Sequence, residues 1–158
     1  MKRITPGGRL AEIIARVPLG VPVLDVGTDH GIAAIALAQR GHAAVYASDI
    51  ARGPLDAARR NAVSRGVADG IEFILADGVP EFLRGKIRCA VVAGMGGETI
   101  AGILARAPWL RDDGVTLVLQ PQTKLDKLLR FLSDSGYPPP SLATVPEKRR
   151  VYTVLTVN

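Results

Sequence analysis

Carboxylates and glycines follow several short apolar runs of this 158-residue chain, where strands would end and loops begin. The run DVGTDHG, Asp25–Gly31, joins acids to glycines, whose backbone lets a ligand approach closely. Asp49 lies about 20 residues past Gly27, the spacing at which an acid accepts hydrogen bonds from ribose hydroxyls. Asp77, within LADGV, could accept the exocyclic amine of an adenine. Together these residues predict a site for an adenosine-containing cofactor.

The turn differs from the dinucleotide fingerprint at the position where a glycine normally admits a pyrophosphate. Thr28 and Asp29 stand there, and a carboxylate would repel a diphosphate. A sulfonium cofactor carries positive charge and an amino-acid tail in place of phosphates, so Asp25 and Asp29 favour S-adenosylmethionine. A dehydrogenase is therefore the least favoured enzyme class.

Short β-branched runs alternate with helical patterns along the chain, and these elements must position the acids. Strands are predicted at VPVLDVG (21–27), AAVYASDI (43–50), IEFILAD (71–77), IRCAVVAG (87–94) and VTLVLQP (115–121). Helices are predicted at RLAEIIARV (9–17), IAAIALAQRG (32–41), GPLDAARRNAVSRG (53–66), GETIAGILARAPW (97–109) and KLDKLLRFLSDSG (124–136).

Two further strands, LATVPE and RRVYTVLTV, follow without a helix between them, so the last strand is expected to run antiparallel beside residues 115–121. The alternation predicts an α/β, Rossmann-like, doubly wound and mostly parallel seven-stranded sheet. Ligands of such sheets bind beyond the carboxyl ends of the strands, where the strand order reverses. The predicted acids and the run AGMGG, Ala93–Gly97, fall at those ends.

Composition narrows the classes of partner. A net charge of +5 favours a polyanion, whereas 4% aromatic residues argue against a stacking platform for single-stranded nucleic acid. Cys89 lies in an apolar run and is expected to be a small buried thiol, and the distant His30 and His42 predict no metal site. Without a signal peptide or an apolar span, the expectation is one cytoplasmic domain over residues 1–158, with no membrane partner.

A set of motifs, in this order, resembles the bacterial tRNA (adenine-22-N1)-methyltransferase family. The matching runs are DVGTDHG, SDIARGPLDAARRNA, ADGV, VVAGMGGETI, LVLQPQ, LRFLSDSGY and PEKRRVYTVL. The resemblance implies a class I methyltransferase fold, S-adenosylmethionine as methyl donor, and transfer to N1 of an adenine in the D-arm of tRNA.

The resemblance also implies which residues form the site. Those that would hold the cofactor are Asp25, Gly27, Thr28, Asp29, His30, Gly31, Asp49, Ile50, Asp77, Gly78, Ala93 and Gly94. Gly94, Met95, Gly96 and Gly97 take the place where related adenine methyltransferases position the target base. Arg9 and Arg52 are the cations chosen for the phosphates of the substrate.

Methylation of adenine N1 needs little acid–base chemistry, because its in-plane lone pair attacks the methyl group directly. An acceptor for the N6 hydrogens would help, and Asp29 is one candidate, beside the backbone of Gly94, Met95 and Gly96. The alternative is that Asp29 caps the following helix or binds the amino group of the cofactor's methionine.

Three departures from the family keep other functions open. This chain reads DHGIAA and LQPQ where members read DHAYLP and LQPN. Members also carry a C-terminal helical region, thought to help grip tRNA, whereas this sequence stops at Asn158. Another RNA or a small molecule is therefore an alternative substrate, and a non-catalytic domain that binds S-adenosylmethionine or RNA is an alternative of another class.

Overall fold

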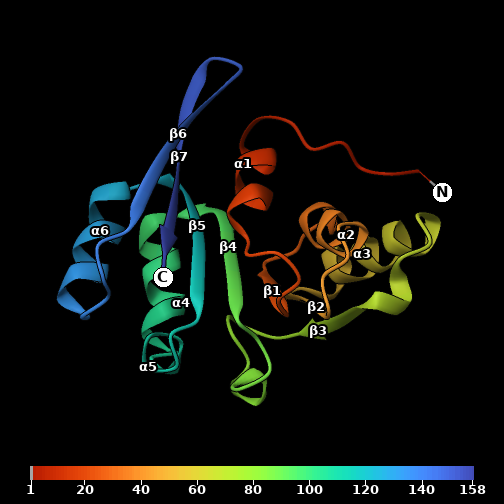
Figure 1. The fold of residues 1–158 in the computed structure, drawn as a ribbon, viewed down its shortest axis with the longest axis horizontal. Coiled ribbons are helices and arrows are strands. Elements are labelled where there is room, and N and C mark those ends of the chain that lie inside the picture. The colour runs from red at the N-terminus through yellow and green to blue at the C-terminus, as the bar shows by residue number, and fades with distance from the viewer. Residues whose placement is uncertain (1) are drawn as a thin grey trace.

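A computed structural model describes residues 2–158, which form one seven-stranded sheet with helices on both faces (Figure 1). The strand order is β3-β2-β1-β4-β5-β7-β6. The strands are β1 Val23–Val26, β2 Val45–Asp49, β3 Ile71–Leu75, β4 Cys89–Gly96, β5 Thr116–Thr123, β6 Ser141–Glu147 and β7 Arg150–Val157. Strands β1 to β5 are parallel, whereas β7 runs antiparallel to both β5 and β6. The predicted fold class, including its antiparallel last strand, is confirmed.

The helices agree with the sequence prediction except in one place. They are α1 Gly8–Arg16, α2 Ile32–Gln39, α3 Arg52–Ser64, α4 Gly97–Ala105, α5 Trp109–Asp112 and α6 Leu125–Asp134, with short 3-10 turns at Ala68–Gly70 and Glu81–Leu83. The single helix predicted over residues 97–109 is wrong at its end, because α4 stops at Ala105 and α5 starts at Trp109. Pro108 has no N–H to continue the helical hydrogen bonds, and it disfavours helical backbone in the residue before it.

Alternate residues of every strand except the edge strand β6 fill two cores, one on each face of the sheet. Val23 packs with Ile35 in the core under α1, α2 and α3, whereas Leu24 packs with Ile100 in the core under α4, α5 and α6. Burial on both faces accounts for the nearly continuous apolar strands. Cys89 is buried in the first core, and this burial raises the pKa of its thiol to about 12, as expected of an inert thiol.

Two features of the topology position the site. The strand order reverses between β1 and β4, so their carboxyl ends form the switch point at which doubly wound sheets bind ligands. The hairpin β6–β7 closes through a two-residue turn, Lys148 and Arg149, and projects past the other elements on the same edge of the sheet (Figure 1). Within residues 2–158, no helix is long and apolar enough to cross a membrane.

Candidate active site

The turn after β1 is fixed between β1 and β2. Its backbone is left-handed at Gly27, Asp29 and Gly31. The Thr28 N–H donates to the Ser48 carbonyl at 2.8 Å, and the Thr28 hydroxyl donates to the Asp25 carboxylate at 2.9 Å. A side chain at Gly31 would come within 2.8 Å of the Ala58 methyl, so glycine is needed there for α2 to approach α3. The turn is therefore preorganised before any ligand enters.

Asp25 is the most perturbed carboxyl among those described. Its side chain is buried, and burial raises its pKa to about 7. The hydrogen bond from Thr28 opposes the rise, and the nearby Asp49 carboxylate adds to it. A cation bound beside Asp25 would favour the ionised form, so the group is suited to meet positive charge.

Asp49 ends β2 and links two loops. One carboxylate oxygen accepts the Asp29 N–H at 3.1 Å, and the other accepts the Ala51 N–H at 3.0 Å, at the start of α3. Each carboxylate oxygen keeps a further lone pair. Asp49 can therefore hold the turn and accept ribose hydroxyls at the same time.

A first cavity of about 180 Å³ lies beyond the ends of β2 and β3, against α4. Asp49 and Ile50 line one part of it, and Asp77, Gly78 and Met95 line another. The apolar Ile50 side chain is 69% exposed beside the Asp49 carboxylate, a surface that a bound adenine would cover. Apolar walls with a carboxylate at each end fit the adenosine part of S-adenosylmethionine.

A second cavity of about 220 Å³ meets the first at Gly27, which lines both. Asp25 and Thr28 of the turn line it, together with Ala93 and Gly94 of β4 and Arg9 of α1. A side chain at Gly27 would collide with the Met95 methyl group. Met95 therefore covers Gly27 from the side of the first cavity and acts as a wall there.

The backbone of the AGMGG segment is held by Gln120, which the sequence analysis did not assign to the site. The Gly94 N–H donates to the Gln120 side-chain oxygen at 3.2 Å, and Gly94 has left-handed backbone. The Gln120 amide is buried and donates to the Pro121 carbonyl at 2.9 Å. One sequence signal could have identified Gln120, because it is an amide inside the apolar run VTLVLQP. A buried amide in such a run must find hydrogen-bond partners.

A second unassigned residue, Arg106, follows α4 and lines the first cavity. Its guanidinium lies 3.0 Å from the Asp77 carboxylate, and this hydrogen bond holds the Asp77 pKa below its ordinary value. Asp77 therefore meets the cavity as an ionised, paired carboxylate. The sequence carries no local signal for the pair, because the two residues belong to different loops.

Several predicted site residues lie outside the walls of both cavities, among the residues described. The Asp29 side chain is 70% exposed, 3.9 Å from the His30 ring, and its backbone N–H is the group that contacts Asp49. Gly96 precedes α4 and packs toward Thr123, and Arg52 is exposed at the start of α3. Their functional roles stay predictions.

Arg9 is tied to three elements while it lines the second cavity. Its guanidinium lies 2.9 Å from the Glu147 carboxylate of β6 and donates to the Gln122 side chain of β5 at 2.8 Å. It also lies over the Tyr152 ring of β7, 4.3 Å from the ring centroid. Arg9 thus joins the start of α1 to the hairpin and to the end of β5.

Comparison with known proteins agrees with this geometry. A family model described as a methyltransferase domain matches residues 7–155. A tRNA (adenine(22)-N(1))-methyltransferase of Bacillus subtilis is 26% identical over 159 residues, which cover 100% of this chain and 67% of the relative. The crystal structure of the B. subtilis M1A22 tRNA methyltransferase TrmK superposes with a TM-score of 0.84 at 26% identity, over 94% of this chain and 64% of TrmK.

A Streptococcus pneumoniae relative, described as a tRNA (m1A22) methyltransferase and solved in complex with S-adenosyl-L-methionine, is 31% identical, with a TM-score of 0.85, over 94% of this chain and 71% of the relative. The chain belongs to the tRNA (adenine-22-N1)-methyltransferase family. As a methyltransferase of this family it uses S-adenosylmethionine, the cofactor predicted from its first turn. The volumes and the acidic lining of the two cavities that meet at Gly27 suit such a cofactor.

Proposed function

We propose that this methyltransferase acts on N1 of an adenine in tRNA, at position 22 of the D-arm. The observation that carries the proposal is the meeting of two cavities at Gly27, one suited to adenosine and the other open toward α1. The B. subtilis relative, whose name gives this activity, matches the whole length of the chain. In the second cavity, the part beside Asp25 and Thr28 is proposed for the amino-acid part of the cofactor, and the part beside Gly94 and Gln122 for the target base.

In this proposal, three carboxylates each contact a different part of the cofactor. Asp49 accepts the ribose hydroxyls, Asp77 lies near the adenine amine, and Asp25 faces the amino-acid part from the second cavity. S-adenosylmethionine supplies an electrophilic methyl group on a positively charged sulfonium. The carboxylates offset that charge in a site partly shielded from water.

The protein mainly has to align adenine N1 with the methyl group and the sulfur of the cofactor, because N1 attacks through a free lone pair and needs no prior deprotonation. The hydrogen bond from Gly94 to Gln120 fixes the backbone of the AGMGG segment. Carbonyl groups of that segment are the proposed acceptors for the N6 hydrogens, which become more acidic as the ring becomes cationic. The Asp29 carboxylate, outside the cavity walls, is the second candidate acceptor.

The variant Asp29→Asn distinguishes between the Asp29 carboxylate and the backbone carbonyls as acceptors of the N6 hydrogens. Asparagine tolerates the left-handed backbone of Asp29, so the turn is retained. A turnover lowered on the order of 100-fold would support a role of the carboxylate in the reaction. Unchanged turnover would remove that role and leave the backbone carbonyls as acceptors.

The function is tested by methyl transfer from labelled S-adenosylmethionine to an unmodified tRNA transcript, followed by nucleoside analysis. A transcript with guanine at position 22 is the matched control. The expected product is 1-methyladenosine in the first transcript alone. Cofactor binding without label in either RNA would contradict the proposed substrate, and label in both would contradict the proposed position.

A further inference from the structure

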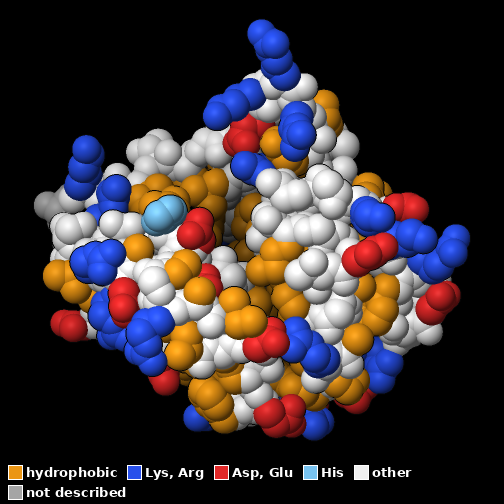
Figure 2. Space-filling model, turned by 180° about the vertical axis from the view of Figure 1, so that it is seen from behind, with side chains coloured by type: hydrophobic (Ala, Val, Ile, Leu, Met, Phe, Trp, Pro, Cys, Tyr) orange, Lys and Arg blue, Asp and Glu red, His pale blue; other side chains and the backbone are white. Residues whose placement is uncertain are grey.

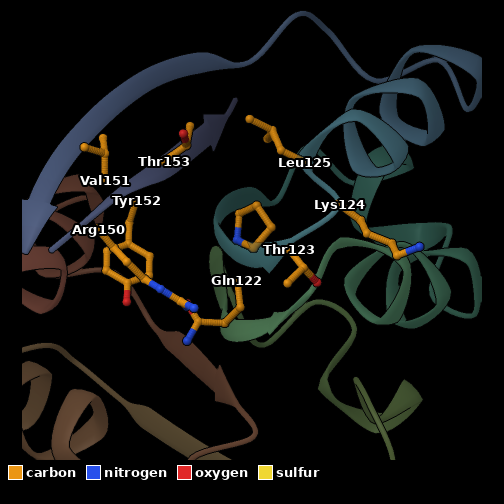
Figure 3. A pocket seen from close by; sticks show the side chains of 9 residues that line it. Gln122, Thr123, Lys124, Leu125, Arg150, Val151, Tyr152 and Thr153 are labelled. Atoms are coloured by element: carbon orange, nitrogen blue, oxygen red, sulfur yellow. The ribbon is translucent and has the colours of Figure 1, made fainter.

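A groove of about 350 Å³ lies between the end of β5 and the start of β7, outside the two cavities described above. Gln122, Lys124, Arg150 and Tyr152 line it, and in Figure 3 the Arg150 side chain extends from β7 toward Gln122. Gln122 also lines the second cavity. The groove therefore leads from the edge of the sheet to the proposed position of the target base.

Positive charge gathers at the outer end of this groove. Lys148, Arg149 and Arg150 are exposed at the tip of the hairpin. No salt bridge engages any of the three within residues 2–158, and the neighbouring Glu147 is paired with Arg9. Figure 2 shows Lys and Arg side chains at the top of the molecule, where the hairpin projects above a hollowed face. The tip thus presents cations that the protein itself does not neutralise.

Two lysines beside the groove occupy backbone that favours glycine. Lys124, before α6, has φ 55°, and Lys148, at the hairpin turn, has φ 57°. Asp29, in the cofactor turn, is the third non-glycine residue with left-handed backbone among those described. Such strain gathers at functional sites, and a two-residue hairpin turn with positive φ at its first position alone, as here, normally carries glycine at that position. Lysine at position 148 therefore makes the turn less stable than glycine would, but it places a positive charge at the tip.

We propose that the groove and the basic hairpin tip bind the phosphate backbone of the RNA next to the adenine that enters the second cavity. The inference rests on the proposed function, because it assigns a surface to the same substrate. Unpaired cations displace counterions from phosphates, and the side chains of Gln122, Thr123 and Thr153 add hydrogen-bonding groups to the groove. Binding at the hairpin would position the RNA through its backbone without reading its sequence.

The test compares wild type with Lys148→Gly/Arg149→Ser. Glycine followed by serine suits a two-residue turn with a left-handed first position, so this variant loses two charges without strain at the tip. Lys86→Gln/Arg88→Gln is the matched control. It removes the same charge from exposed residues just before β4, at the opposite edge of the sheet.

Affinity for a tRNA transcript is measured by fluorescence anisotropy across a salt series, with KM from methyl transfer and cofactor affinity from calorimetry. In the hairpin variant, tRNA affinity is expected to fall roughly tenfold at low salt, and the slope of log K against log salt to become shallower by about 1 to 2. KM for tRNA is expected to rise in parallel, with unchanged cofactor affinity. The control variant is expected to stay within about twofold of wild type.

Equal losses in the hairpin variant and the control would overturn the inference, because they would reflect net charge alone. If the two variants lose affinity equally but wild type still methylates tRNA, the proposed function is retained and only the assignment of the hairpin is rejected. Absence of methylation with a retained hairpin effect would reject the proposed function and keep an RNA-binding surface. Tighter binding of poly-L-glutamate than of tRNA, lost in the hairpin variant, would assign the surface to an acidic protein and overturn the inference.

Discussion

The buried Asp25 carboxyl makes the stability of this protein depend on pH in an unusual direction. Its pKa is raised from 3.8 to about 7, mainly by burial. Between these two values the folded protein keeps a proton that the unfolded chain has released. The contribution of Asp25 to stability is therefore full below about pH 4 and is lost as the pH rises to about 7. Over this range the free energy of unfolding falls by at most roughly 1.4 kcal/mol per pH unit.

Asp25→Asn is expected to remove this dependence. Urea unfolding from pH 4.5 to 7.5 should show a free energy of unfolding that declines with pH in wild type, and less so in the variant. Asp134→Asn, at an exposed position of α6, is the matched control and should follow wild type. The same decline in Asp25→Asn as in wild type would contradict the burial of an ionisable group here.

Cofactor affinity is expected to have the opposite dependence on pH. The ionised Asp25 attracts the positively charged cofactor, so S-adenosylmethionine should bind more tightly as the pH rises through about 7. Isothermal titration calorimetry at pH 6, 7 and 8 measures this change. Asp25→Asn should bind more weakly with little change over that range, and an equal pH response in both proteins would place Asp25 away from the cofactor charge.

Among the elements, α1 and the hairpin are joined by one ion pair. Arg9 and Glu147 are each about a third exposed or less, so water screens their attraction in part. Arg9→Ala and Glu147→Gln are each expected to lower the free energy of unfolding by about 1 kcal/mol. A double-mutant cycle should give a coupling energy of the same order. Additive losses would show that the pair contributes nothing as a pair.

The sequence predicted the strands and most helix positions, because β-branched runs and apolar spacing are local signals. It also placed Asp25, Asp49 and Asp77 correctly at strand ends, since parallel strands bring their carboxyl ends to one edge. The contacts of Arg106 with Asp77 and of Gln120 with Gly94 could not be predicted, because they depend on how α4 and β5 pack against neighbouring loops. The outward direction of the Asp29 side chain could not be predicted either, because it depends on the left-handed backbone of the turn.

For the whole molecule, cofactor binding at the switch point should stabilise the folded state. At 100 times its dissociation constant, a ligand adds about 2.7 kcal/mol, which raises the Tm of a chain of this size by roughly 5 to 10 °C. Thermal unfolding with and without S-adenosylmethionine measures the shift. Asp49→Ala should reduce it strongly, whereas Asp69→Ala, exposed in the 3-10 turn at Ala68–Gly70, should retain it. An equal shift in both variants would exclude Asp49 from the cofactor site.

The hairpin turn lies beyond every residue that lines the two cavities, although its strands are continuous with the sheet. Residues inserted at Lys148 and Arg149 would extend into solvent and leave the acids of the first turn unchanged. On the proposed assignment, the affinity for RNA and the capacity to bind the cofactor can therefore evolve separately. Exchanging this turn between relatives becomes a direct route to altered RNA affinity while the cofactor site stays unchanged.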